Sequence, residues 1–222
     1  MSILALRRCS GEQSSEFNYQ FEPMYGLPPS TILSKPLYKK AVFEKFNLKN
    51  AERDHFDADI SKMVLMAYVS QERIPALAEG AEVKGFYVLQ VTMKRKEYDV
   101  KNILLLHKLI PQKIVFLLQY DEQTQLCVFH TRLQQSDWMP DADVTIPLQG
   151  LSLDDVWNKI IASIGGLDTD AEETLEEQII NREQREKLLR QIEMLEKRCR
   201  IEKQTRKKFE LHQRISKLKE QL

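Results

Sequence analysis

Residues 114–120 read IVFLLQY, an almost continuous apolar run of strand length. Such a run is typical of a strand that is buried on both faces of a sheet. Upstream, residues 98–110 carry apolar side chains at helical spacing and end before Pro111, and residues 83–93 (VKGFYVLQVTM) are rich in β-branched and aromatic residues. The sequence therefore predicts a strand, a crossover helix and a second strand.

The second strand is followed by a turn and a third strand. Residues 121–124 are polar, and residues 125–131 (QLCVFHT) have the composition of the returning arm of a hairpin. Because crossover connections are right-handed, we expect the first two strands to be parallel and the third to run antiparallel beside the second. The centre of the chain is thus predicted to be a β-α-β-β core.

Further patterns flank this core. Apolar residues at spacings of three and four predict helices over residues 34–47, with Pro36 in the first turn, and over residues 50–70. Residues 152–164 (SLDDVWNKIIASI) predict another helix, and residues 143–148 predict a short edge strand. The expected fold class is α+β, a small mixed sheet with flanking helices.

The chain is expected to have three parts. Residues 1–27 are mostly polar and end in a turn-rich stretch, so they are predicted to be a flexible N-terminal arm, and residues 28–166 form the globular domain. After Leu167 there is no Gly, no Pro and a single aromatic residue, Phe209. Residues 167–222 are therefore predicted to be one long charged amphipathic helix of coiled-coil type.

This long helix carries an apolar seam in two pieces that do not share one heptad register, so the helix must adjust near residues 200–208. A lone helix cannot bury such a seam. Its partner is a second copy in a coiled-coil dimer, another protein, or the globular domain of the same chain, and the sequence leaves these alternatives open. The predicted partner-binding residues are Leu188, Ile192, Leu195, Leu211, Ile215 and Leu218.

The end of the same helix is strongly basic. From Lys197 to Lys219 there are ten Lys and Arg residues and two Glu residues, a local excess of 10 − 2 = 8 positive charges. Nucleic-acid phosphates are attracted to such a segment. Two other interpretations stay open, a solvated charged face and neutralisation by the acidic residues 168–186 in an antiparallel pairing. The residues predicted to contact nucleic acid or an acidic partner are Arg200, Lys203, Arg206, Lys207 and Lys208.

Composition excludes several classes of protein. The 33 basic and 33 acidic residues balance, no apolar run approaches a membrane span of roughly 18 residues, and the start of the chain lacks the order of an export signal. The three cysteines, Cys9, Cys127 and Cys199, are far apart and without a CxxC pair, as in reduced cytoplasmic proteins. We expect a cytoplasmic protein that contacts no membrane and holds no cofactor or structural metal.

The predicted core invites comparison with restriction-endonuclease-like nucleases, in which one strand carries an acid and, two residues later, a lysine that together serve a bound metal ion. The corresponding positions here are Gln90 and Thr92, which removes the main metal ligand. Four acids would supplement the site only if the fold brought them together: Asp57, Asp59, Glu79 and Glu82.

Other catalytic chemistry has little support in the sequence. The loop motifs of nucleotide-binding proteins and of proteases are not found. His107 lies among leucines and is predicted to be a hydrogen-bonded core histidine, and Cys127 is predicted to be an inert buried thiol. No catalytic residues are therefore assigned.

Several segments together resemble the bacterial family known as domain of unknown function 4391. They are MYGLPPSTILSKPLYKKAVFEKF (24–46), FDADISKM (56–63), LIPQKIVFLLQYD (109–121), SDW (136–138), SLDDVWNKIIASI (152–164) and EKQTRKKFELHQRISKLKEQL (202–222). The resemblance implies an accessory protein encoded beside helicases and DNA methyltransferases of restriction-type or phage-defence clusters. It offers no catalytic motif that could be mapped onto this chain.

We therefore expect a non-enzymatic interaction subunit of a DNA restriction-modification or phage-defence complex that assembles through its C-terminal helix. The partner would be the chain itself or another protein, such as a helicase or a DNA methyltransferase, and nucleic acid is a further candidate ligand. The alternative is a degenerate restriction-endonuclease-like nuclease or a nucleic-acid-binding protein.

Overall fold

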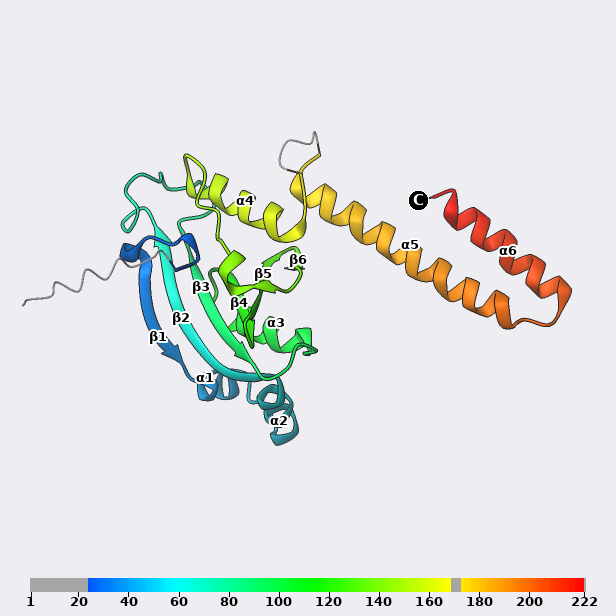
Figure 1. The fold of residues 1–222 in the computed structure, drawn as a ribbon, viewed down its shortest axis with the longest axis horizontal. Coiled ribbons are helices and arrows are strands. Elements are labelled where there is room, and N and C mark those ends of the chain that lie inside the picture. Colours follow the sequence, from blue (N-terminus) through cyan, green and yellow to red (C-terminus); the bar gives the residue numbers. More distant parts are fainter. Residues whose placement is uncertain (1–23, 169–172, 222) are drawn as a thin grey trace, which may run out of the picture.

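The computed structural model describes residues 24–168 and 173–221, which form a curved mixed sheet with helices on both faces and a projecting helical hairpin (Figure 1). Neighbouring strands follow the order of the sequence, and the pair β3–β4 is parallel whereas the other pairs are antiparallel. The mixed sheet and its β-α-β-β core are thus confirmed. The strands are β1 (Ile32–Leu37), β2 (Ile60–Ser70), β3 (Gly85–Met93), β4 (Lys113–Tyr120), β5 (Gln123–His130), β6 (Arg132–Gln135) and β7 (Met139–Pro140), which pairs with β5.

Helices cover both faces of the sheet (Figure 1). On one face, α1 (Lys39–Lys45), α2 (Asn50–Asp59) and α3 (Val100–Leu109) contribute Val42, Phe56 and Leu106 to a shared apolar core. On the other face, α4 (Leu153–Gly165) contributes Trp157 and Ile160 to a second core. Three short 3-10 turns complete the part of the domain that the structure describes: Met24–Gly26, Pro29–Thr31 and Asp141–Asp143.

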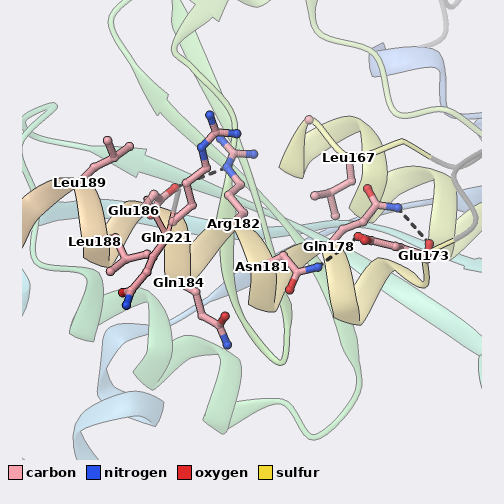
Figure 2. A pocket seen from close by; sticks show the side chains of 12 residues that line it. Leu167, Glu173, Gln178, Asn181, Arg182, Gln184, Glu186, Leu188, Leu189 and Gln221 are labelled. Carbon is pink, nitrogen blue, oxygen red and sulfur yellow. Dashed lines mark hydrogen bonds and ion pairs between the residues drawn. The ribbon is translucent and has the colours of Figure 1, made fainter. Parts of the chain in front are cut away.

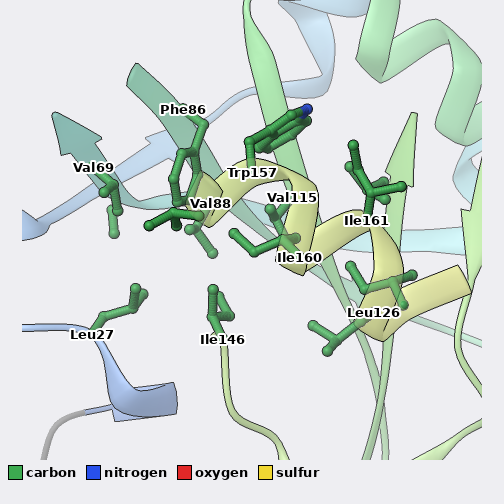
Figure 3. Close-up of a cluster of buried hydrophobic side chains, with 14 of the residues drawn as sticks. Leu27, Val69, Phe86, Val88, Val115, Leu126, Ile146, Trp157, Ile160 and Ile161 are labelled. Carbon is green, nitrogen blue, oxygen red and sulfur yellow. The ribbon is translucent and has the colours of Figure 1, made fainter. Parts of the chain in front are cut away.

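The buried strand β4 supplies side chains to both cores. Phe116 and Leu118 belong to the core under α2 and α3, whereas Val115 and Leu117 belong to the core under α4, and all four are fully buried. This alternation follows from the period of two in a strand. Figure 3 shows the α4 side, where Val115 lies near Trp157 and Ile160 and residues of the neighbouring strands complete the cluster.

The helix predicted over residues 152–164 is confirmed, with a role that the sequence did not reveal. Ser152 accepts a hydrogen bond from the Asp155 N–H (3.2 Å) and Gly166 ends α4 in the left-handed region, with φ of 60°. The Asp154 carboxylate accepts hydrogen bonds from the backbone N–H groups of Ala81 (2.6 Å) and Val83 (2.8 Å). The β2–β3 loop is therefore tied to the first turn of α4.

The helix predicted over residues 50–70 is wrong in its second half. The helix α2 ends at Asp59, and the chain passes directly into β2, which pairs with β1 and β3. Register shifts near Ile60 and near Leu65 break the strict alternation, so that buried Ile60, Met63 and Met66 are three residues apart. Two irregularities in this strand thus produce an apolar spacing that resembles the spacing of a helix.

Three smaller predictions also need correction. In the range 34–47, β1 extends through Leu37 before α1 begins, and Ser34 has a left-handed φ of 51° at an irregularity of this edge strand. Residues 143–148 form no strand, and the edge is built by β6 and β7 instead. Most of the predicted arm, residues 1–27, lies outside the described residues, but Leu27 is 1% exposed and belongs to the core.

A long C-terminal helix is confirmed, but it does not run to residue 222. The helix α5 (Leu175–Ile201) is 27 residues long, and a second helix, α6 (Thr205–Lys219), folds back along it. Between them Glu202 is extended (φ −67°, ψ 124°), and its side chain accepts a hydrogen bond from the Gln204 N–H (2.9 Å). The register change inferred near residues 200–208 is thus a turn of the chain.

One buried carboxylate joins three elements of the domain. Asp59, at the end of α2, is fully buried and accepts hydrogen bonds from Arg95 Nε (2.5 Å), the Asp99 N–H (2.9 Å) and Asn102 Nδ2 (2.7 Å). Burial alone would raise the pKa of Asp59, but the Asp99 N–H, Arg95 and Asn102 outweigh it and hold the pKa below its usual value. The ionised carboxylate therefore stabilises the junction of α2 with the β3–α3 loop and α3.

Replacing Asp59 with Asn should destabilise the domain by about 2–3 kcal/mol, because hydrogen bonds to a buried charge are lost. Since the folded pKa is lowered, the contribution of Asp59 is present above its ordinary pKa of 3.8 and is lost as the pH falls through the folded value. Urea unfolding at pH 7 and at pH 3 measures both effects.

The matched control is Asp57→Asn on the same helix. Asp57 is half exposed and pairs with Lys39 (2.6 Å), so its removal should cost less than about 1 kcal/mol. Equal losses for the two variants, or an Asp59→Asn deficit that is as large at pH 3 as at pH 7, would contradict this assignment.

Candidate functional site: a docked helical hairpin with a basic tip

The base of α5 is packed into the globular domain. Ile179 is 1% exposed and belongs to the core under α4. Arg132, at the start of β6, donates from Nη2 to the Ile179 carbonyl (3.3 Å) and forms an ion pair with Glu183 (3.5 Å). Arg182 donates to the carbonyl of Gly165 at the end of α4. These contacts from two elements fix the direction in which α5 leaves the domain.

A weaker contact lies one turn earlier. His130 Nε2 is 3.7 Å from a Glu176 carboxylate oxygen. Burial and the nearby Lys113 lower the pKa of His130, although Glu176 opposes the change. The ring is therefore mostly neutral at pH 7, and the docking of α5 depends mainly on Ile179, Arg132 and Arg182.

A groove of about 790 Å³ lies beside the base of α5, and Figure 2 shows the side chains that line it. Most of its polar side chains form hydrogen bonds or ion pairs with one another or with nearby backbone groups. Gln178 Nε2 donates to the Glu173 carbonyl (3.1 Å), and Arg182 pairs with Glu186 (3.4 Å). The groove runs along α5 from Gly166 and Leu167 to Gln221 after α6, its charges are balanced, and it does not single out a ligand.

The predicted seam residues pack against one another inside the hairpin. Ile192 and Cys199 of α5 and Ile215 of α6 are buried, and Leu195, Leu211 and Leu218 pack around them. Leu188 is half-buried and lines the groove at the base. The ion pair between Lys219 and Glu196 (2.9 Å) joins the two helices at the surface. The fold thus covers the seam within one chain, and its contact with an external partner stays a prediction.

The turn of the hairpin carries the cations. We define the basic tip as residues 198–214, which contain seven Lys and Arg residues and two Glu residues, a net charge of 7 − 2 = +5. Among the described residues, a carboxylate lies within ion-pair distance of Arg206, which pairs with Glu210 (3.4 Å), and of none of the other six. The six are Arg198, Arg200, Lys203, Lys207, Lys208 and Arg214. Four of the five predicted nucleic-acid contacts therefore have no carboxylate within ion-pair distance among the described residues.

Two grooves flank the hairpin near this tip. The first, of about 750 Å³, is lined by four cations, Arg198, Lys203, Lys207 and Arg214, and by two acids, Glu202 and Glu210. The second, of about 480 Å³, is lined by three cations, Arg200, Lys208 and Lys219, and by one acid, Glu196. Both sides of the hairpin are therefore net positive. The acidic residues described within 168–186 lie at the base, so the fold does not pair them with the basic tip.

The structure does not assemble the residues considered for a nuclease. Gln90 donates to Gln119 on the neighbouring strand β4. Asp59 binds Arg95 at the C-terminal end of β3, whereas Glu79 pairs with Lys84 (3.4 Å) before the N-terminal end of the same strand. In residues 24–168 and 173–221 no three His, Cys, Asp or Glu side chains are close enough to hold a metal ion.

The two candidate nucleophile or base residues are packing residues. His107 stacks on Phe129 with ring centroids 4.2 Å apart, and burial, followed by Lys113 and Lys108, lowers its pKa. Its buried Nδ1 has no hydrogen-bond partner among the described residues, so at this atom the structure does not show the hydrogen bond expected for His107. Burial raises the pKa of Cys127 to about 12, which keeps the thiol protonated at neutral pH.

The docking residues Arg132, Ile179 and Arg182 were missed in the sequence. Their contacts join positions 17 to 47 residues apart, and no local pattern marks them. Ile179 lies near the start of α5, and in the sequence it looked like one more apolar position of a long helix. Its heptad neighbours gave no sign that it belongs to the globular core.

Fold and site together define a mixed α/β domain that carries a docked helical hairpin with a basic tip. In the described part of the chain no helix combines the length and apolarity needed to cross a membrane. The sequence matches the family model described as "Domain of unknown function (DUF4391)" over residues 25–222. The chain belongs to this family, which confirms the resemblance seen in the sequence. No match was found among curated proteins or among solved structures.

Replacing Ile192 with Ala should open the hairpin without unfolding the domain. The buried seam is small, so removing one of its buried side chains should cost about 2 kcal/mol or more and raise hydrogen exchange throughout α6. Both tryptophans, Trp138 and Trp157, lie in the globular domain, so denaturation followed by tryptophan fluorescence should be unchanged.

The control is Leu189→Ala, because Leu189 is on the same helix but 48% exposed. It should leave hydrogen exchange in α6 as it is. Uniform exchange rates in α6 across the wild type and both variants would show that the seam does not hold the two helices together.

Proposed function

We propose that this protein is a non-enzymatic interaction subunit that binds nucleic-acid phosphates through the basic tip of its docked hairpin. The observation that carries the proposal is the set of six cations at residues 198–214 that have no carboxylate partner among the described residues. Cations held close together without neutralisation attract a polyanion, and release of its counterions drives the association.

The docking of α5 supports the proposal. Arg132 and Arg182 bind α5 to β6 and α4, and Ile179 anchors it in the core, so the tip is presented in one direction away from the sheet. A site fixed to the domain in this way loses less conformational entropy on binding than a free helix would. The hairpin can therefore connect nucleic acid bound at its tip to a protein partner bound to the globular domain.

The second part of the proposal concerns the complex to which such a subunit would belong. The family resemblance implies accessory proteins encoded beside helicases and DNA methyltransferases, and a subunit of a DNA restriction-modification or phage-defence complex would bind near DNA. A self-associating subunit is the competing form of the proposal. Light scattering on the purified chain distinguishes the two, because a self-association model requires at least a dimer in the absence of nucleic acid.

Replacing Lys203, Lys207 and Lys208 with Gln should weaken binding of the full chain to DNA. With a DNA duplex as the ligand, each phosphate contact contributes about 0.9 to the slope of log affinity against log salt. The triple variant should therefore lower the magnitude of that slope by about three and reduce the affinity at least about tenfold at low salt. Fluorescence anisotropy over a series of salt concentrations measures both quantities.

The matched control removes three exposed lysines of the globular domain, Lys62, Lys101 and Lys159, and so changes the net charge by the same amount. It should bind nearly as the wild type does. If the wild type shows no affinity at low salt, or if the two triple variants lose the same affinity, the tip is not the binding site.

A further inference from the structure

The basic tip also exposes an aromatic ring. Phe209, on α6, is 62% exposed, and it is the single aromatic residue in the chain after Leu167. Residues three apart are neighbours on a helix surface, so the ring lies beside Arg206 on one side and His212 on the other. An exposed phenyl ring in a cluster of cations gains nothing from the apolar seam, which faces α5.

Two residues close to Phe209 on α6 line the second groove of the hairpin, although Phe209 itself does not. Lys208, the residue directly before Phe209, and His212, three residues after it, both line that groove together with Arg200. Arg200 and Lys208 have no carboxylate within ion-pair distance among the described residues. A groove lined by positive side chains, with an exposed aromatic ring on the same helix, is a combination that binds single strands, because phosphates follow the cations and a base stacks on the ring.

We infer that the tip binds single-stranded nucleic acid, with the backbone along the groove of Arg200 and Lys208 and a base stacked on Phe209. This inference rests on the proposed function, since it names the form of nucleic acid that the same tip recognises. A duplex keeps its bases stacked inside and offers the tip phosphates alone. An unpaired strand offers phosphates and the faces of its bases, so it uses both features of the site.

The charge at this site favours a nucleic-acid strand over an apolar protein surface. Burying Phe209 against an apolar partner would also bury the unneutralised Lys208 and the neighbouring Arg206, at a cost in desolvation. A polyanion neutralises Lys208 while it covers the ring. An anionic lipid surface shares this charge, so vesicles are included in the test.

The test compares three labelled ligands of equal length, an oligothymidine, an abasic oligomer with the same phosphates, and a DNA duplex, with the full chain at low salt. Phe209→Ala and Phe209→Leu should each weaken oligothymidine binding about tenfold, whereas Phe209→Tyr should retain it. Binding to the abasic oligomer and to the duplex should not change. Met194→Ala is the control, because Met194 is equally exposed on the same hairpin (64%) outside the basic tip.

Three results would overturn the inference. If oligothymidine and the abasic oligomer bind alike and the Phe209 variants change neither, the tip reads phosphates only, and the proposed function stands without a stacked base. If no nucleic acid binds at low salt, the proposed function falls as well. If vesicles of anionic phospholipid bind and Phe209→Ala removes that binding while oligothymidine binds weakly, the surface is a membrane site.

Discussion

The structure depends on covering both faces of β4. Val115 and Leu117 point to one face, Phe116 and Leu118 to the other, and all are withdrawn from water. Full burial of each such side chain contributes about 1.5–3 kcal/mol. A strand of this kind is stable only between two layers, which requires α4 on one side and α2 and α3 on the other. The placement of helices on both faces of the sheet follows from this requirement.

The sequence predicted this centre well because its local signals agree with the tertiary structure. In residues 114–120 composition alone indicates two-sided burial, and in residues 152–164 the cap, the apolar face and the terminal glycines all indicate the same helix. The prediction failed at β2, where register shifts changed the spacing of buried side chains to three. It also failed at Ser34, where an irregularity with positive φ lies inside an edge strand.

Only part of the candidate site could be predicted from the sequence. Charge and the apolar seam are local properties, so the cations near Lys207 and the seam around Ile192 could be named from spacing. The turn at residues 202–204 could not, because it contains no Gly or Pro and is stabilised by a side chain of its own, Glu202. The docking by Arg132 and Ile179 was hidden for another reason, since it joins segments that are distant in sequence.

The length of α5 has an electrostatic consequence. From the anchored Ile179 to Ile201 at the turn, the helix spans about 33 Å at 1.5 Å per residue. Salt screens exposed charges over about 8 Å at physiological ionic strength, so the carboxylates near the anchor contribute almost nothing to the potential at the far end. A molecule whose formal charge is zero can in this way present a positive field at one end, because distance rather than composition separates its two signs of charge.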